Sequence, residues 1–335
     1  MHRITRSIGS AHADPVIDTS KEIIIRKVLI IRPNHRLGNQ LLLTPIVQDV
    51  INTFPNCEIE LFVKGGVAVP VFENYKHINK IIQLPKKPFD QLFKYVMVWV
   101  SIRSKRYDLV INGDKDSSSG RLLTALSKAN FKVFGDIHED IQNTYPDHMH
   151  IAKYPVYGFR RYLTKLGFKE NASLVPTLNI KLNDEEIAKG KSILDAIVKN
   201  NKKTICLFTN ATGAKCYSEA WWESLYSRML KAYPNHNIIE MLPIENISKI
   251  NFKAPHFYSK DIREMGGILA NTAVFVAADN GVMHLASASQ VPTVGFFSVT
   301  NKDVYRPYGN GSIAIDTNTN STEDIIKQLD KILEI

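Results

Sequence analysis

The most informative stretch of the sequence is Val274-Phe275-Val276-Ala277-Ala278-Asp279-Asn280-Gly281-Val282-Met283-His284-Leu285-Ala286-Ser287-Ala288. Residues 274–278 form a short apolar run, rich in β-branched and aromatic side chains, that ends abruptly in polar residues. This pattern predicts a buried strand. Asn280-Gly281 predicts a sharp turn, because glycine tolerates backbone conformations closed to other residues. From Met283 onward, apolar and small residues recur at helical spacing, which predicts a helix packed closely on a sheet.

A strand, a turn and a helix in this order predict a ligand site. The first turn of a helix offers unpaired backbone N–H groups and the positive end of the helix dipole, which suits a phosphate. Asp279 falls at the carboxyl end of the predicted strand, where α/β folds place their chemistry. Two interpretations of Asp279 stay open: it contacts a ligand, or it simply caps the helix, which is the commonest function of such an aspartate.

The composition is that of a soluble globular protein. The chain has 335 residues, 44% hydrophobic and 22% charged, which is enough for two domains of ordinary size. Its formal net charge of +9 favours anionic partners such as nucleotide phosphates, nucleic acid or an acidic membrane surface. The three cysteines lack metal-like spacing and indicate a reducing compartment. No apolar run approaches the roughly 20 residues that span a bilayer. Residues 1–22 lack the apolar core of a secretory signal, and we expect a disordered tail there.

The first half of the chain predicts repeated βαβ units. Residues 23–31 form an apolar strand pattern, and an apolar helix is expected from about residue 41 to residue 54. Between them, Gly38 would let the backbone approach a ligand at the helix N-terminus. Further strands are predicted at 58–63 and 78–84.

The segment from Lys86 to Arg106 is basic at both ends and aromatic between them. Basic, aromatic-rich helices can lie on anionic membranes. More often such a helix packs one face on a sheet and leaves its ends in water. Both interpretations stay open, alone or together.

Polar residues follow the next predicted strand, residues 107–111. Asp114 and Asp116 form a D-x-D pattern, which holds a divalent metal in some glycosyltransferases but is also common in solvated turns. At the end of a strand, either carboxylate is a candidate general base. Four further residues could ligate a metal, but their irregular spacing argues against it: His138, Glu139, His148 and His150.

The second half repeats the design after a predicted linker at residues 171–180. Residues 204–208 are expected to form a strand, followed by a polar, glycine-containing loop at 209–215 and a helix. Residues 238–242 predict another strand. We therefore expect a first domain at 23–175 and a second at 176–335.

Several motifs resemble the ADP-heptose–lipopolysaccharide heptosyltransferases, family nine of the glycosyltransferases. Residues 279–286 resemble the family's D-[ST]-G-x-x-H-L-A signature, and residues 292–300 its P-x-V-x-L-F-G-x-T strand and loop. The loop at 209–222 resembles the donor loop P-G-x-x-x-x-K-x-W-P-x-E-x-W, with Lys215 at the family's lysine and Tyr217 where the family has tryptophan. The resemblance covers residues 27–330 and is strongest in the second half.

The start of the chain is similar to the family's strand, R-x-x-x-x-G-D and apolar helix, but Asn39 stands where the family has its catalytic Asp. The resemblance implies a substrate-binding set comprising Gly38, Thr209, Asn210, Lys215, Glu245, Asp279, Asn280, Gly281, Met283 and His284. Asn39, Asp114 and Asp116 are the catalytic candidates. In the family, Lys215 would neutralise the diphosphate, and the Glu245 position often contacts the nucleoside. A merely solvated loop lysine is the simpler interpretation of Lys215.

The implied fold is GT-B, with two Rossmann-like, doubly wound α/β domains facing a cleft. The implied activity is inverting transfer of a heptose or related sugar from a nucleoside diphosphate, ADP-heptose by resemblance, to a lipopolysaccharide core or other surface glycan. Neither a metal nor another cofactor is expected, because Lys215 and a helix N-terminus would take the developing phosphate charge. We expect a cytoplasmic protein with a lipid-linked or glycan acceptor and peripheral contact with anionic membrane at the inner face.

A second hypothesis belongs to a different class. An amide cannot accept the acceptor's proton, so Asn39 is also compatible with a catalytically attenuated relative that only binds sugar nucleotides. No nucleic-acid-binding motif is found, and no G-x-x-x-x-G-K-[ST] supports a nucleotide kinase. An intact donor half favours the transferase.

Overall fold

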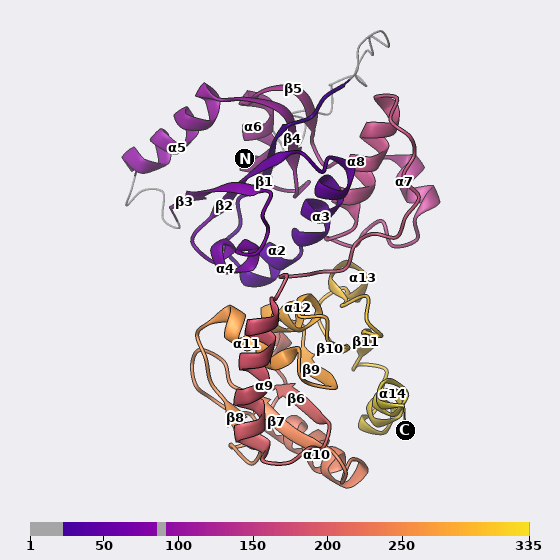
Figure 1. The fold of residues 1–335 in the computed structure, drawn as a ribbon. Helices are drawn as coiled ribbons and strands as arrows, with labels where there is room; N and C mark the ends of the chain where they lie inside the picture. The colour runs from indigo at the N-terminus through magenta and orange to yellow at the C-terminus, as the bar shows by residue number, and fades with distance from the viewer. Residues whose placement is uncertain (1–22, 86–91, 335) are drawn as a thin grey trace. The chain divides into compact units, whose positions relative to one another are not determined.

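The computed structural model describes residues 23–85 and 92–334 (Figure 1). The chain divides into two compact units, which meet in the sequence between Pro176 and Thr177. The predicted tail at 1–22 and the first part of the predicted basic helix, residues 86–91, lie outside the described residues.

The first unit is an α/β layer structure around a five-stranded sheet of order β3-β2-β1-β4-β5. Every strand pair in it is parallel. Its described elements are β1 (Lys27–Arg32), α2 (Leu37–Leu41), α3 (Thr44–Thr53), β2 (Glu58–Lys64), α4 (Ala68–Phe72), β3 (Ile78–Leu84), α5 (Leu92–Ser104), β4 (Arg106–Asn112), α6 (Ser118–Leu126), β5 (Lys128–Val133), α7 (Glu139–Thr144) and α8 (Tyr154–Lys165).

The second unit contains a six-stranded parallel sheet of order β11-β10-β9-β6-β7-β8. Numbered within the unit, this order is 3-2-1-4-5-6 read from the β8 edge, the Rossmann arrangement. Its elements are α9 (Asp184–Val198), β6 (Thr204–Phe208), a 3₁₀ turn (Gly213–Lys215), α10 (Glu219–Ala232), β7 (Asn237–Met241), β8 (His256–Phe257), α11 (Ile262–Leu269), β9 (Val274–Ala278), α12 (Gly281–Ala288), β10 (Thr293–Phe297), α13 (Lys302–Tyr305), β11 (Ile313–Asp316) and α14 (Thr322–Leu333).

The central strands of both sheets are apolar because helices cover them on both faces. All five residues of β6, β9 and β10 are buried, as the apolar run at 274–278 predicted for β9. In the second unit the core includes Trp222, which is fully buried against Phe296 with ring centroids 5.8 Å apart. These rigid strands fix where the following loops begin.

The predicted helix at about 41–54 is α3, which begins at Thr44 and ends at Thr53. A separate short helix, α2, forms at Leu37–Leu41, between the predicted strand and the predicted helix. Pro45 lies in the first turn of α3, where its missing N–H costs nothing, and Thr44 donates from Oγ1 to the Leu41 carbonyl at 2.7 Å.

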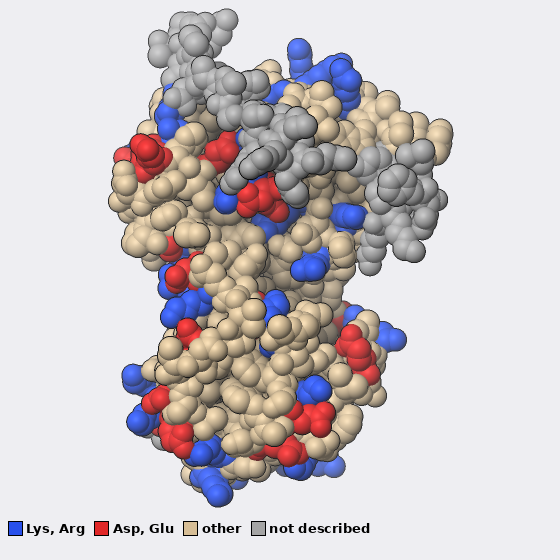
Figure 2. All heavy atoms as spheres, turned by 180° about the vertical axis from the view of Figure 1, so that it is seen from behind, with Lys and Arg blue, Asp and Glu red and all other residues tan. Residues whose placement is uncertain are grey.

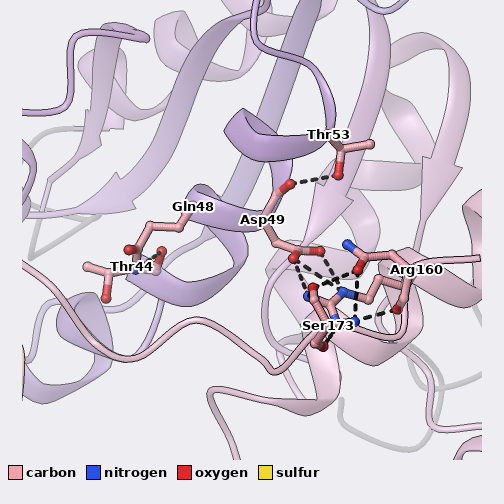
Figure 3. A network of polar contacts seen from close by, with 7 residues as sticks. Thr44, Gln48, Asp49, Thr53, Arg160 and Ser173 are labelled. Carbon is pink, nitrogen blue, oxygen red and sulfur yellow. Dashed lines mark hydrogen bonds and ion pairs between the residues drawn. The ribbon is translucent and has the colours of Figure 1, made fainter. Parts of the chain in front are cut away.

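A buried ion pair joins α3 to α8 (Figure 3). Arg160 Nη2 lies 2.5 Å from Asp49 Oδ1, and Arg160 Nε donates to Asp49 Oδ2 at 3.0 Å. The same guanidinium donates from Nη1 to the Ser173 carbonyl at 2.5 Å. Arg160 therefore fixes both a helix pair and the start of the segment that leads out of the first unit.

Candidate functional site

Each sheet reverses its strand order at one point, between β1 and β4 in the first unit and between β6 and β9 in the second. Both pairs are parallel, so the loops that follow them leave the same edge of the sheet. Open α/β sheets bind ligands outside the carboxyl ends of the strands at such points. Most predicted site residues follow these four strands: Gly38 and Asn39 after β1, Asp114 and Asp116 after β4, Thr209, Asn210 and Lys215 after β6, and residues 279–284 after β9.

Lys215 and Asp279 form an ion pair in the second unit. Lys215 Nζ lies 3.0 Å from Asp279 Oδ2. The Asp279 side chain is 6% exposed and that of Lys215 is 33% exposed. The pair therefore places a cation from the β6 loop at the end of β9, with one side open to solvent. An arriving anion would share this ammonium with the carboxylate.

Asn280, rather than Asp279, caps α12. Its Oδ1 accepts hydrogen bonds from the backbone N–H groups of Val282 at 2.8 Å and Met283 at 2.9 Å. Its Nδ2 donates to the Asn210 carbonyl at 3.1 Å, which ties the β9 turn to the β6 loop. The Asp279 carboxylate therefore does not cap the helix and pairs with Lys215 instead.

This cap corrects two expectations about the turn. Two N–H groups that were expected to be unpaired at the start of α12 are already bonded to Asn280 Oδ1. Gly281 is the first residue of α12 and is not among the described residues with a positive φ. The turn is made by extended backbone at Asn280, with φ −153° and ψ 178°. An anion here would rely on Lys215 and on the Gly281 N–H, which takes no part in the cap.

Glu240 is a buried carboxyl that sequence reasoning missed. It lies within β7, is fully buried, and accepts hydrogen bonds from Thr209 Oγ1 at 2.6 Å and Ser248 Oγ at 2.5 Å. Burial raises the pKa of Glu240. Thr209 Oγ1 in turn accepts the Lys249 N–H at 3.0 Å. Thr209 belongs to the predicted substrate-binding set. In the structure its hydroxyl group links the Lys249 N–H to the Glu240 carboxyl and so holds the 248–249 segment to the sheet. The sequence signal was a charged residue inside the apolar run 238–242.

Three other residues of the predicted substrate-binding set differ in their exposure. Glu245 is exposed in the turn after β7, which the Asn246 N–H closes by bonding to the Pro243 carbonyl at 2.8 Å. Met283 is fully buried, with its sulfur close to Gly295 of β10, and His284 is 4% exposed. Helical periodicity alone could not separate a core position such as Met283 from a ligand-facing one.

In the first unit, Asn39 contacts Arg32, a residue that sequence reasoning left outside the site. Arg32 is the last residue of β1 and is fully buried. Its Nη2 donates to Asn39 Oδ1 at 2.9 Å, and its Nη1 donates to the Gly113 carbonyl, also at 2.9 Å. Gly38 is buried within α2. Five residues separate Arg32 from Gly38, one more than in the family pattern.

Asp114 and Asp116 begin the loop after β4. Asp114 is half-buried, and its Oδ1 accepts the Asp116 N–H at 3.1 Å. Asp116 is exposed, and its Oδ2 lies 3.0 Å from Lys115 Nζ. Because Arg32 bonds to Gly113, the Asn39 amide and the Asp114 loop are anchored to the same guanidinium. The predicted neighbourhood of Asn39 and Asp114 at one sheet edge is thus observed.

Within residues 23–85 and 92–334, no three His, Cys, Asp or Glu side chains are grouped so that they could hold a metal ion. The D-x-D pattern is accounted for by a turn and an ion pair. No helix among the described residues is both long and apolar enough to cross a membrane.

Residues 259–331 match the model of glycosyltransferase family 9 (heptosyltransferase). The matched segment contains β9, α12 and β10, and with them Asp279 and its cap. This segment is therefore similar to family 9 of the glycosyltransferases. Over 293 residues the chain is 20% identical to lipopolysaccharide heptosyltransferase 3 of Escherichia coli K12, covering 81% of this chain and 82% of that protein.

Solved structures give the same picture of the fold. A glycosyl transferase family 9 protein from Veillonella parvula is 14% identical, with a TM-score of 0.72 over 94% of this chain and 99% of that one. The E. coli heptosyltransferase WaaC with ADP gives 15% identity and a TM-score of 0.64 over 92% and 99%, and the same protein with ADP-2-deoxy-2-fluoro heptose gives 14% and 0.61 over the same shares. The chain therefore has the GT-B fold, with two Rossmann-like units.

Proposed function

We propose that the protein is a family 9 glycosyltransferase that moves a heptose, or a related sugar, from ADP-heptose onto a lipopolysaccharide core or another surface glycan. The observation that carries the proposal is the Lys215–Asp279 pair at the β6/β9 reversal of the second unit, tied to the capped α12 by Asn280. A cation and a carboxylate side by side suit a sugar diphosphate, since one neutralises phosphate and the other accepts hydroxyl groups. The E. coli relatives named above support this choice, since one of them, WaaC, was solved both with ADP and with ADP-2-deoxy-2-fluoro heptose.

The reaction is an in-line displacement with inversion. An acceptor hydroxyl oxygen forms a bond to the anomeric carbon while the bond from that carbon to the diphosphate oxygen breaks. The bonding electrons leave with the diphosphate, whose added negative charge Lys215 offsets. The hydroxyl proton passes to a carboxylate, for which Asp114 is the first candidate and Asp116 the second.

Asn39 supports a competing proposal. If no carboxylate takes the proton, the chain binds the sugar nucleotide but turns over slowly or not at all. Donor binding is common to both proposals, whereas dependence of turnover on Asp114 is specific to the first.

Donor binding is tested by calorimetry against ADP-heptose and GDP-, UDP- and TDP-sugars. ADP-heptose should bind most tightly. When its concentration is 100 times its Kd, it should raise the free energy of unfolding by about 2.7 kcal/mol, which an unfolding experiment measures. Lys215→Ala should weaken binding by about 1–3 kcal/mol, because it removes a charge-assisted hydrogen bond to phosphate.

Lys191→Ala is the matched control. Lys191 is paired with Asp195 on α9, with its Nζ 2.9 Å from the carboxylate, and follows none of the strands at the reversal. Its removal should leave donor affinity unchanged. Equal affinity of the Lys215→Ala and Lys191→Ala proteins for ADP-heptose would remove Lys215 from the proposed site.

We further propose that the enzyme works in the cytoplasm and docks on the inner face of an anionic membrane through α5. Val98, Trp99 and Ile102 pack toward the sheet core. The exposed residues on α5 include an apolar set at spacings of three and four, with exposed fractions of 81%, 49%, 49% and 55%: Phe93, Val96, Met97 and Val100. We call this set the α5 apolar face. Arg103 is exposed in the last turn of α5, and Arg106 is exposed at the start of β4. The free cysteines suit a reducing compartment.

The membrane proposal predicts sedimentation with anionic vesicles that weakens as salt rises, since exposed charges are screened within about 10 Å at 0.1 M. Val96→Ser with Val100→Ser should reduce the bound fraction about tenfold or more, because two apolar side chains leave the lipid interface. Leu230→Ser, at a 50% exposed position of α10, is the control and should bind like the wild type. Equal binding to neutral and anionic vesicles would contradict the proposal.

A further inference from the structure

Arg32 is a buried cation for which the described residues provide no carboxylate partner. Its side chain is fully buried and makes two hydrogen bonds, from Nη1 to the Gly113 carbonyl and from Nη2 to Asn39 Oδ1. Its Nε is buried without a hydrogen-bond partner. Buried charges are normally paired, since transfer from water into the protein interior is costly for an isolated ion. Here neutral carbonyl oxygens take the place of the counter-ion.

This contact decides which way the Asn39 amide points. A guanidinium only donates hydrogen bonds, so it must face the amide oxygen and not the amide nitrogen. With Oδ1 held by Arg32, the remaining polar group of Asn39 is its NH2, which has no hydrogen bond to another described residue. Asn39 is only partly buried, so this donor is open to a ligand.

We infer that Arg32 is a positioning residue that holds Asn39 as a hydrogen-bond donor to an oxygen of the acceptor. The inference rests on the proposed function for the identity of the acceptor site, but the Arg32–Asn39 geometry stands without it. In this arrangement the NH2 group of Asn39 orients the acceptor, and the proton of the reacting hydroxyl goes elsewhere. Asn39 is then a group with its own role and not a disabled base.

The charge of Arg32 gives the inference a test that needs no substrate. In Asn39→Asp the new carboxylate would face a buried guanidinium and form an ion pair with it. In the Arg32→Met background the same carboxylate would be partly buried without a partner. Asn39→Asp should therefore raise the thermal midpoint of the wild-type protein by several degrees and lower that of Arg32→Met. Asn34→Asp is the control. Asn34 lies in the same loop, and its side chain accepts a hydrogen bond from the Arg36 N–H. Asn34→Asp should therefore shift the thermal midpoint equally in the wild-type and Arg32→Met backgrounds.

Kinetics provide the second readout. Asn39→Asp replaces the donor by an acceptor, so kcat/KM for the acceptor should fall about tenfold or more while donor affinity stays unchanged. Arg32→Lys keeps the charge but loses the two-pronged contact with Asn39 and Gly113, and should show the same split. If Arg32→Met fails to fold, kcat/KM of Arg32→Lys for the acceptor still tests the role of Arg32.

Two results would overturn the inference. One is an equal shift of the thermal midpoint by Asn39→Asp in the wild-type and Arg32→Met backgrounds. Should Arg32→Met not fold, the corresponding result is an unchanged kcat/KM for the acceptor in Arg32→Lys. The other is faster turnover of Asn39→Asp than of wild type, which would make Asn39 a weakened base. If no heptose donor is used at all, the proposed function fails, while the midpoint comparison still decides the role of Arg32.

Discussion

Replacing Asp114 by Asn should lower turnover by about 10²–10⁴-fold, the usual contribution of a general base, and leave donor affinity nearly intact. Asp114 follows β4, which pairs directly with β1, and its loop is anchored through Gly113 to the guanidinium that holds Asn39. Asparagine keeps the oxygen that accepts the Asp116 N–H, so the turn should survive the substitution. The measurement is single-turnover transfer at saturating donor, with donor affinity determined separately by calorimetry.

Asp116→Asn is the competing variant and should have the smaller effect. Asp116 is exposed, and its carboxylate is engaged by Lys115. Asp195→Asn, an exposed carboxylate on α9, controls for the loss of one negative charge and should leave turnover unchanged. If neither loop variant slows transfer and Asn39→Asp accelerates it greatly, the base does not lie in the 114–116 loop, and the wild-type chain is better described as an attenuated member of its family.

Local sequence patterns predicted the strands and helices that carry the candidate site. The run 274–278 predicted β9, because a buried parallel strand is apolar along its whole length. The small residues after it predicted α12, because apolar and small side chains recur at helical spacing in a closely packed helix. The same patterns placed Asp114 and Lys215 in loops that follow strands. The neighbours of those loops were set by strand order, which pairs β1 with β4 and β6 with β9 across long stretches of chain.

Contacts between residues far apart in sequence could not be predicted. Arg32 reaches Gly113 across 81 positions, and Lys215 reaches Asp279 across 64. Whether Asp279 or Asn280 caps α12 depends on where the helix begins to within one residue, and patterns define helix ends only loosely. Glu240 did leave a signal, a charge in an apolar strand, but its partners Thr209 and Ser248 come from two other segments.

The second large effect concerns stability. Arg160→Met should destabilise the first unit by about 3–5 kcal/mol, because it leaves the Asp49 carboxylate buried without its counter-ion. The Asp49 and Arg160 side chains are 2% and 7% exposed, and Figure 3 shows them facing each other with Ser173 beside the guanidinium. The measurement is urea unfolding followed by a probe within the first unit, since two units need not unfold in one step.

Arg161→Met is the matched control for the Arg160 variant. Arg161 is the adjacent arginine of α8, and its partner Asp140 is 55% exposed, so this pair should contribute only about 0–1 kcal/mol. The double variant Asp49→Leu with Arg160→Met should recover much of the stability lost by Arg160→Met alone, because no unpaired charge remains buried. The Ser173 carbonyl would still lose its donor, so recovery should be incomplete. A loss for Arg160→Met no larger than for Arg161→Met would show that the buried pair does not hold α3, α8 and the 171–173 segment together.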